Sequence, residues 1–350
     1  MPSVKEIVDN PNWYCHAINL DTGRLGFVKT TKTALSETTF LDARFDVSKL
    51  ESTSSSIQEC VNYIDGKDAP APKYIFHTAF CCSTLLARCL DLPESNVSIK
   101  EPAVLMALAN YKRTGHKALV NSNGADINEA EAIYGLVNHL LFRPFGENES
   151  IVVKPTNTVN NIICQLMATH PESKALLLHS DLKSFLISLL KKGEEGRGFA
   201  RQLFNIFFMD SAEAQLLQQN QLLRMTDMQV AAITWHLQLE NYFDAFAKFE
   251  NSKVKSLYCD RLLDNSNDIL TKVVSNFGLT KLEQNIDQML EHAPLQKNSK
   301  TPGKAFTAQD RKIEHSEVAS LYADSLNTII PWAKQLSFKY PYSDNIANSL

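Results

Sequence analysis

The segment that most constrains the fold of this chain runs from residue 74 to residue 90. A short apolar strand at residues 74–76 is followed by a loop and then by a helix-like stretch that begins with Ser83 and Thr84. This order predicts an anion cradle, because the first amide groups of a helix lack partners within it. The loop at residues 77–82 contains neither the glycine nor the lysine of a nucleotide P-loop. The predicted cradle therefore departs from the usual nucleotide type.

Size, charge and hydropathy set the class of protein. The chain has 350 residues, of which 44% are hydrophobic and 21% charged, so it is long enough for one large α/β domain or two smaller ones. The net charge of −4 gives no general reason to expect nucleic-acid binding. We find no signal peptide and no apolar run near the ~20 residues that cross a bilayer. We expect a soluble protein with no membrane span.

The cysteines indicate a reducing compartment. Seven are scattered along the chain, an odd number that fits reduced thiols better than a disulfide framework. None has the spacing of zinc ligands, so we expect no metal. Cys81, Cys82 and Cys89 are expected to pack as small apolar side chains. A cytoplasmic location is the prediction that follows.

The first 70 residues are predicted to form a small β-rich extension. A turn at Asp21-Thr22-Gly23 separates two of its strands. The expected elements are strands at residues 13–18, 24–28 and 40–45 and a helix at residues 53–64. Residues 65–72 have the composition of a linker. We therefore predict two units, residues 1–70 and residues 71–350.

From residue 71 onward, strands alternate with helices, which is typical of a parallel sheet covered by helices on both faces. Residues 174–179 are apolar almost throughout, as expected for a strand buried on both sides. Residues 199–249 are expected to be helical, and residues 191–198 to form a solvated loop or a mobile flap. The remaining expected strands are residues 97–100, 150–154 and 254–258, and the remaining helices are residues 103–112, 128–142, 159–168, 182–191 and 269–277. The predicted fold class is α/β, a three-layer parallel sheet.

Polar residues gather where the predicted strands end. In a parallel sheet these ends lie at one edge, where ligands bind. Besides the cradle, Lys100 and Glu101 follow the second strand, Lys154 ends the third, and Ser180 follows the fourth. Lysine ammonium groups in such places hold anions as point charges. We therefore predict a site for an anionic ligand at this edge.

The same motifs, in the same order, resemble those of the sulfotransferase family, P-loop relatives that use 3′-phosphoadenosine 5′-phosphosulfate as sulfuryl donor. Cys82-Ser83-Thr84-Leu85-Leu86 is similar to the family's Gly-Ser-Thr-Leu-Leu segment, and Val153-Lys154-Pro155 to its Lys-Pro motif after a strand. Ser180 and Ser188 stand where the family has an arginine and a serine that bind the 3′-phosphate. Lys304 lies in a basic segment that resembles the loop closing on that phosphate.

The resemblance implies a P-loop NTPase-like fold and sulfuryl transfer to a hydroxyl or amine acceptor. It implies that Glu101 is the base and Lys154 the second catalytic residue, with His77 and His179 as second choices for the base. The residues that it assigns to the nucleotide donor are Cys82, Ser83, Thr84, Ser180, Ser188 and Lys304.

The chain also departs from the family. Phe80 stands at the place of the cradle lysine, Cys82 at that of the glycine and Ser180 at that of the arginine. Sulfuryl transfer depends on neutralising charge on the bridging oxygen. The replacement for the missing lysine would be Lys100, Lys154, Arg88 or His77.

Plainer interpretations stay open beside this one. Ser83 and Thr84 fit a simple N-cap, as does Asp181, while His179 and Trp235 fit core positions. The alternative function is a catalytically silent relative that serves as a nucleotide-binding or interaction module. A kinase-like use of the cradle is a third hypothesis, against which the absence of a Gly-Lys-Ser/Thr motif argues.

Overall fold

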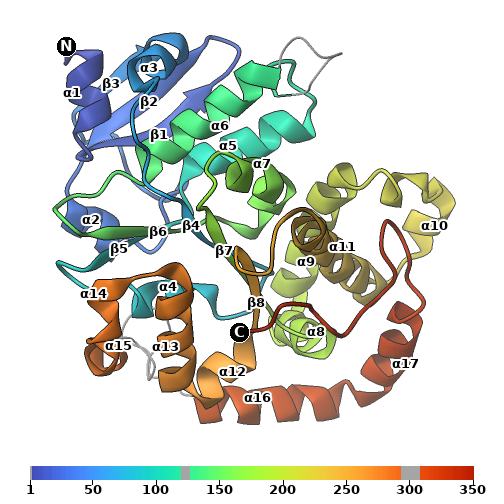
Figure 1. The fold of residues 1–350 in the computed structure, drawn as a ribbon. Helices are drawn as coiled ribbons and strands as arrows, with labels where there is room; N and C mark the ends of the chain where they lie inside the picture. Colours follow the sequence, from blue (N-terminus) through green and yellow to red (C-terminus); the bar gives the residue numbers. More distant parts are fainter. Residues whose placement is uncertain (1, 120–126, 293–307) are drawn as a thin grey trace.

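A five-stranded parallel sheet forms the centre of the molecule (Figure 1). The computed structural model describes residues 2–119, 127–292 and 308–350. The strands are β4 (Lys73–His77), β5 (Asn96–Lys100), β6 (Ser150–Lys154), β7 (Lys174–His179) and β8 (Val254–Tyr258). They lie side by side in the order β5-β6-β4-β7-β8, and every neighbouring pair is parallel.

Each central strand is apolar because both of its faces are covered. In β4, Ile75 packs into one hydrophobic cluster, while Tyr74 and Phe76 pack into another on the opposite face. The first cluster includes residues of α4 (Ser83–Cys89), α12 (Cys259–Asp264), α13 (Ser266–Phe277), α14 (Thr280–Glu283) and α15 (Ile286–His292). The second includes residues of α5 (Ala103–Arg113), α6 (Ile127–Leu141), α7 (Ile163–Ala168), α8 (Leu182–Leu190), α9 (Gly193–Asp210) and α11 (Asp227–Lys248).

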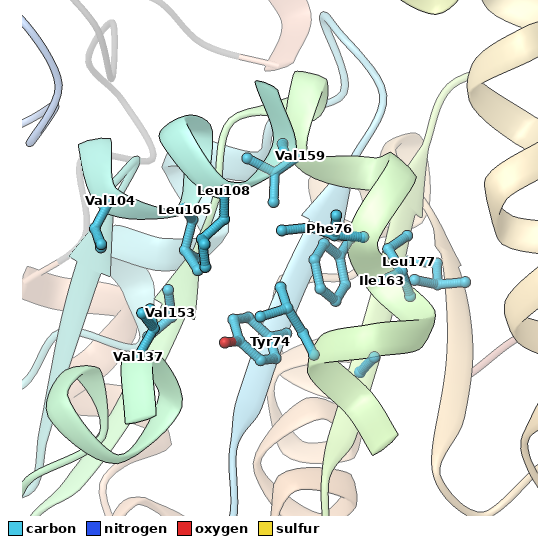
Figure 2. Packing of buried hydrophobic residues seen from close by; sticks show 14 of the residues in the cluster. Tyr74, Phe76, Val104, Leu105, Leu108, Val137, Val153, Val159, Ile163 and Leu177 are labelled. Carbon is cyan, nitrogen blue, oxygen red and sulfur yellow. The ribbon is translucent and has the colours of Figure 1, made fainter. Parts of the chain in front are cut away.

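Figure 2 shows part of this second cluster, where Tyr74 and Phe76 lie among the aliphatic side chains of the covering helices. The tyrosine hydroxyl would be costly to bury alone, and it donates a hydrogen bond to the Asn138 side chain. The α/β fold with a three-layer parallel sheet that the sequence predicts is confirmed, together with its N-terminal β-rich extension.

The helices that follow β4 and β7 lie on opposite faces of the sheet, although the two strands are neighbours. The helix α4 after β4 packs in the first cluster, and α8 after β7 packs in the second. Where the helices after two neighbouring strands leave for opposite faces of a sheet, a crevice forms outside the carboxyl ends of these strands. The topology thus directs attention to the loop between β4 and α4.

The N-terminal extension is a three-stranded antiparallel sheet, β1-β2-β3, with three helices. Its elements are α1 (Val4–Asp9), β1 (Trp13–Asn19), β2 (Arg24–Lys29), α2 (Lys32–Glu37), β3 (Ser52–Ser56) and α3 (Ile57–Ile64). Its apolar residues, among them Trp13 and Phe27, belong to the same core cluster as the helices α5 and α6. The division of the chain at residue 70 stays a prediction.

Two sequence predictions in the extension are wrong. Residues 40–45 form no strand; Leu41 exchanges backbone hydrogen bonds with Lys100 and Ala103 at the end of β5, and a turn follows. The third strand is instead Ser52–Ser56, which pairs with β2, so the helix expected from residue 53 begins at Ile57. Serines favour neither structure strongly, and pairing with an available sheet edge decided the outcome.

The predicted loop at residues 191–198 is also wrong, because α9 already begins at Gly193. A side chain at Gly196 would place its Cβ 2.1 Å from the carbonyl oxygen of Leu189, so glycine permits α9 to turn closely against the end of α8. The rest of the long helical region is divided into α9, η2 (Ala214–Leu216), α10 (Gln219–Arg224) and α11.

The predicted helix at residues 159–168 has a tighter first part, since η1 (Asn157–Ile162) precedes α7. The chain ends with α16 (Ala308–Leu321), α17 (Ala323–Ala333) and an irregular segment. Among the described residues, no helix combines the length and the apolar character that crossing a bilayer requires.

Candidate active site

A cavity of about 410 Å³ lies at the carboxyl end of β4, at the divergence of the helices. Ser83 and Thr84 at the start of α4 line it, and Glu101 lines it from the end of β5. The cradle and the predicted base therefore meet at one cavity. Much of the remaining wall is apolar and includes Phe40, Phe80, Met106, Phe199, Leu203 and Ile206.

The loop between β4 and α4 is held by hydrogen bonds from both sides. The backbone N–H of Ala79 donates to Gln238 of α11 over 3.1 Å, and Asn160 of η1 donates to the carbonyl of His77 over 3.1 Å. The Cys81 thiol donates to the carbonyl of Thr78. Burial raises the pKa of Cys81 to about 12, so this cysteine is a packing residue, as predicted.

Three non-glycine residues on the cavity wall adopt left-handed backbone conformations. The φ angles are 60° for Phe80, 61° for Cys82 and 56° for Glu101. Such conformations cost a non-glycine residue on the order of 1–3 kcal/mol and cluster at functional sites. Cys82, not Ser83, is the N-cap residue of α4, and its positive φ is a backbone conformation that favours glycine. The simple capping interpretation of Ser83 and Thr84 is therefore wrong.

Lys154 lies behind the cavity wall, with its side chain fully buried. Its ammonium group donates to Glu101 Oε1 over 2.7 Å and lies 3.2 Å from His77 Nε2. Both Glu101 and His77 line the cavity. A buried cation thus stands directly behind a carboxylate and an imidazole that face the cavity.

The N-terminal extension supplies a further cation that the sequence analysis missed. The Arg44 guanidinium forms an ion pair with Glu101 over 3.2 Å and another with Asp42, and it stacks on the Phe40 ring at 3.5 Å. All four residues line the cavity. No motif around Arg44 indicated this role, because the contact depends on how residues 38–46 pack across the end of β5.

Arg311 of α16 is the second cation that the sequence analysis missed. Its guanidinium donates to Cys82 Sγ over 2.9 Å and forms an ion pair with Asp260 over 3.4 Å. The arginine thus reaches the cradle from a helix 229 positions further along the chain.

Two other candidate cations do not line this cavity. The buried Lys100 ammonium donates to the carbonyls of Ser36 and Ser98 and to the Asp91 carboxylate, and burial lowers its pKa. Arg88 donates to the Thr39 hydroxyl over 2.6 Å. These hydrogen bonds of Lys100 and Arg88 join segments of the fold and do not reach the cavity.

The predicted residues after β7 lie outside the lining of this cavity. Ser180 is fully buried, and its hydroxyl has no hydrogen-bond partner among the described residues. Ser188, on α8, donates to the carbonyl of Ser184 over 2.9 Å. Lys304 lies outside the described residues.

The plainer interpretations hold for the neighbours of Ser180. Asp181 caps α8 by accepting from the backbone of Ser184 over 2.6 Å. Burial lowers the pKa of His179 to about 4, so its imidazole is neutral at pH 7. Trp235 is a core residue whose indole donates to the carbonyl of Ser180 over 2.9 Å. In the described part of the chain, we find no group of three or more His, Cys, Asp or Glu side chains that would hold a metal ion.

No protein-family model matches this chain, and no curated protein matches it. Solved structures do. Sulfotransferase STF9 from Mycobacterium avium is similar, with 12% identity, a TM-score of 0.38, and coverage of 81% of this chain and 83% of that one. Sulfotransferase STF1 from Mycobacterium tuberculosis H37Rv shows 14% identity, a TM-score of 0.40, and coverage of 76% and 79%.

The sulfotransferase domain from the curacin biosynthetic pathway is similar as well, with 13% identity, a TM-score of 0.39, and coverage of 73% of this chain and 99% of that domain. All three belong to the family that the sequence motifs resemble. A likeness at this level concerns the course of the chain and says nothing about activity.

Proposed function

We propose that this protein transfers a sulfuryl group from 3′-phosphoadenosine 5′-phosphosulfate to a hydroxyl or amine acceptor. The observation that carries the proposal is the meeting of the cradle hydroxyls and a carboxylate at one cavity. Ser83, Thr84 and Glu101 line it together, and the Lys154 ammonium lies 2.7 Å from the Glu101 carboxylate.

In the proposed reaction, the bond between sulfur and the bridging oxygen of the donor breaks while the acceptor oxygen or nitrogen bonds to sulfur. Glu101 accepts the proton that the acceptor loses, since its carboxylate faces the cavity. Ser83 and Thr84 donate hydrogen bonds to the sulfuryl and 5′-phosphate oxygens. The positive charge of Lys154 acts on the negative charge that grows on the leaving phosphate.

The shape of the cavity suggests where the acceptor binds. Phe80, where related chains have the cradle lysine, packs against Phe185 and Phe199, with ring centroids 6.0 and 5.6 Å away. Together with Met106 and Ile206 it gives the cavity an apolar side. We therefore assign the acceptor to this side and expect an apolar or aromatic body that carries the reacting group.

The 3′-phosphate is assigned to Ser180, Ser188 and Lys304. The buried hydroxyl of Ser180, which has no partner among the described residues, supports its place in this set, since such a hydroxyl is rarely left without one. The cysteines of the chain remain in keeping with a cytoplasmic location.

The test is isothermal titration of the full chain with adenosine 3′,5′-bisphosphate, the desulfated donor. We expect saturable binding and about 10-fold weaker binding in the double variant Ser83→Ala, Thr84→Val, which removes two hydrogen bonds to phosphate. Thr271→Ala on α13, whose hydroxyl donates to the carbonyl of Asn267, is the matched control and should bind as the wild type does. Absence of heat at millimolar nucleotide would overturn the proposal.

The second candidate is a catalytically silent relative that binds a nucleotide or a protein partner. The packing of Phe80 in an aromatic group at the place of a cradle lysine favours it. This candidate predicts nucleotide binding without turnover. Transfer of radiolabelled sulfate to a panel of phenols, alcohols and amines separates the two, since the enzyme consumes the donor and the silent relative does not.

A further inference from the structure

Two cysteines and one arginine meet at the cradle, and the proposed reaction assigns a role to none of the three. One guanidinium nitrogen of Arg311 donates to Cys82 Sγ over 2.9 Å, and the other lies 3.8 Å from Cys259 Sγ. Cys82 is the N-cap residue of α4, and Cys259 is the first residue of α12 after β8. Segments 177 positions apart in the chain thus bring two sulfur atoms to one cation.

The surroundings give the two sulfur atoms different chemistry. The Cys259 thiol is fully buried, and its hydrogen bond with Cys82 together with this burial raises its pKa well above the usual range. Cys259 therefore keeps its proton, and its thiol has Asp260 Oδ1 at 3.4 Å as an acceptor besides the Cys82 sulfur. The Cys82 sulfur accepts from the Arg311 guanidinium over 2.9 Å, and a cation at this distance favours a thiolate over a thiol.

Access also differs between the two cysteines. Cys82 is partly exposed and lines the cavity, while Cys259 is covered. A small oxidant in the cavity therefore reaches Cys82 first. Cys81 and Cys89 lie close by in sequence, but both are buried, burial raises the pKa of each to about 12, and Arg311 donates a hydrogen bond to neither of them.

We propose that Cys82 and Cys259 are a peroxide-sensitive thiol pair that forms a disulfide across the mouth of the cradle. The Cys82 thiolate attacks one oxygen of hydrogen peroxide, the O–O bond breaks, and the departing hydroxide takes up a proton to give water. The Cys259 sulfur then attacks Cys82 Sγ of the sulfenic acid, the Cys259 proton passes to the departing hydroxyl, and the S–S bond forms as a second water leaves. Two thiols lose two electrons in total, and one peroxide is reduced to two waters.

The disulfide has a structural consequence for the cradle. It removes the thiolate that holds Arg311 and ties the start of α4 to the start of α12. The guanidinium keeps its ion pair with Asp260 and leaves the cradle. If the cavity binds the nucleotide donor, which is a matter for the proposed function, oxidation then weakens that binding.

The test is peptide mapping of the full chain after treatment with one equivalent of hydrogen peroxide, without reduction. We expect one cross-linked pair of peptides, which joins Cys82 to Cys259. In Cys259→Ser we expect Cys82 to accumulate as the sulfenic acid and to be trapped by dimedone. In Cys82→Ser we expect no cross-link and an unmodified Cys259. This readout does not involve a nucleotide, so its failure and failure of the proposed function are separate results.

The role of the cation is tested with Arg311→Met, which keeps an unbranched stem and removes the charge. We expect sulfenic acid formation at Cys82 to slow by about 10-fold, because the thiolate loses its charged donor. Arg224→Met, on the exposed end of α10, should leave the rate unchanged. The proposal is overturned if Cys60 or Cys164 is oxidised before Cys82, if Cys82 pairs with Cys81 or Cys89, or if Arg311→Met leaves the rate as it was.

Discussion

The carboxyl ends of the parallel strands fall into two groups, which differ in whether their polar side chains face a cavity or pack against neighbouring side chains. At the ends of β4 and β5, His77 and Glu101 face a cavity, with the Lys154 ammonium of β6 directly behind them. At the ends of β7 and β8, the His179 and Tyr258 rings lie 5.8 Å apart, and Trp235 donates to the carbonyl of Ser180. A position at the carboxyl end of a strand therefore identifies a residue as a candidate for the site. The packing of the covering helices then determines whether its side chain faces the cavity.

The same lesson appears at two lysines that are paired in register on neighbouring strands. Lys100 and Lys154 are partners in the β5–β6 pair, and both side chains are fully buried. The Lys100 ammonium donates to two carbonyl oxygens and to Asp91, whereas Lys154 contacts two groups that line the cavity. Burial of a cation says little about function until its partners are known.

The largest effect is expected from Glu101→Gln. This change removes the proposed base and leaves Lys154 without the carboxylate at 2.7 Å, while the size of the side chain is kept. We expect kcat to fall by about 100- to 10,000-fold, the usual contribution of a general base. The measurement is donor consumption at saturating acceptor, with nucleotide affinity followed separately by titration.

Glu94→Gln is a close control for this change. Glu94 also has a positive φ, 62°, and also pairs with a lysine, Lys32, but its side chain is 84% exposed and lies outside the cavity lining. We expect wild-type kcat. Equal rates for both variants would contradict the assignment of Glu101 as the base.

The next effect concerns stability and separates the two lysines. Lys100→Met leaves the Asp91 carboxylate without its buried cation, and we expect the free energy of unfolding in urea to fall by about 3–5 kcal/mol. Lys154→Met should in addition abolish turnover, because it removes the charge behind Glu101. A Lys100→Met protein that folds stably but has lost kcat would contradict the structural role given to Lys100.

The fold was predictable because the strands are apolar runs, as at residues 174–179, and the segments between them have helical periodicity. The prediction of secondary structure was wrong at the serine-rich residues 52–56, where pairing with a sheet edge outweighs a weak local preference for helix or strand. It was also wrong at Gly193, where several glycines suggested a loop. That Thr84 and Glu101 share one cavity was predictable, because each follows the carboxyl end of a parallel strand. Arg44 and Arg311 were missed because their contacts join segments 57 and 229 positions apart, which no local pattern encodes.

A smaller effect is expected from His179 in acid. Burial lowers its pKa from 6.5 to about 4, so as pH falls from 6.5 to 4 the unfolded chain takes up a proton that the folded chain does not. Stability is therefore greatest above pH 6.5, and this residue accounts for a loss of about 3 kcal/mol by pH 4. Comparing urea unfolding of His179→Asn with the wild type from pH 7 to pH 4 should show a flatter profile in the variant. Parallel pH profiles of stability would mean that the His179 imidazole at the end of β7 is accessible to water.

The smallest effect is expected from Ser180→Ala, which tests whether the carboxyl end of β7 takes part in ligand binding. The Ser180 hydroxyl has no hydrogen-bond partner among the described residues, so its removal should change the free energy of unfolding by less than about 1 kcal/mol. If a ligand phosphate satisfies this hydroxyl, affinity for adenosine 3′,5′-bisphosphate falls by about 2- to 10-fold in the variant, as expected for one hydrogen bond. Unchanged affinity would remove the Ser180 hydroxyl from the groups assigned to the 3′-phosphate.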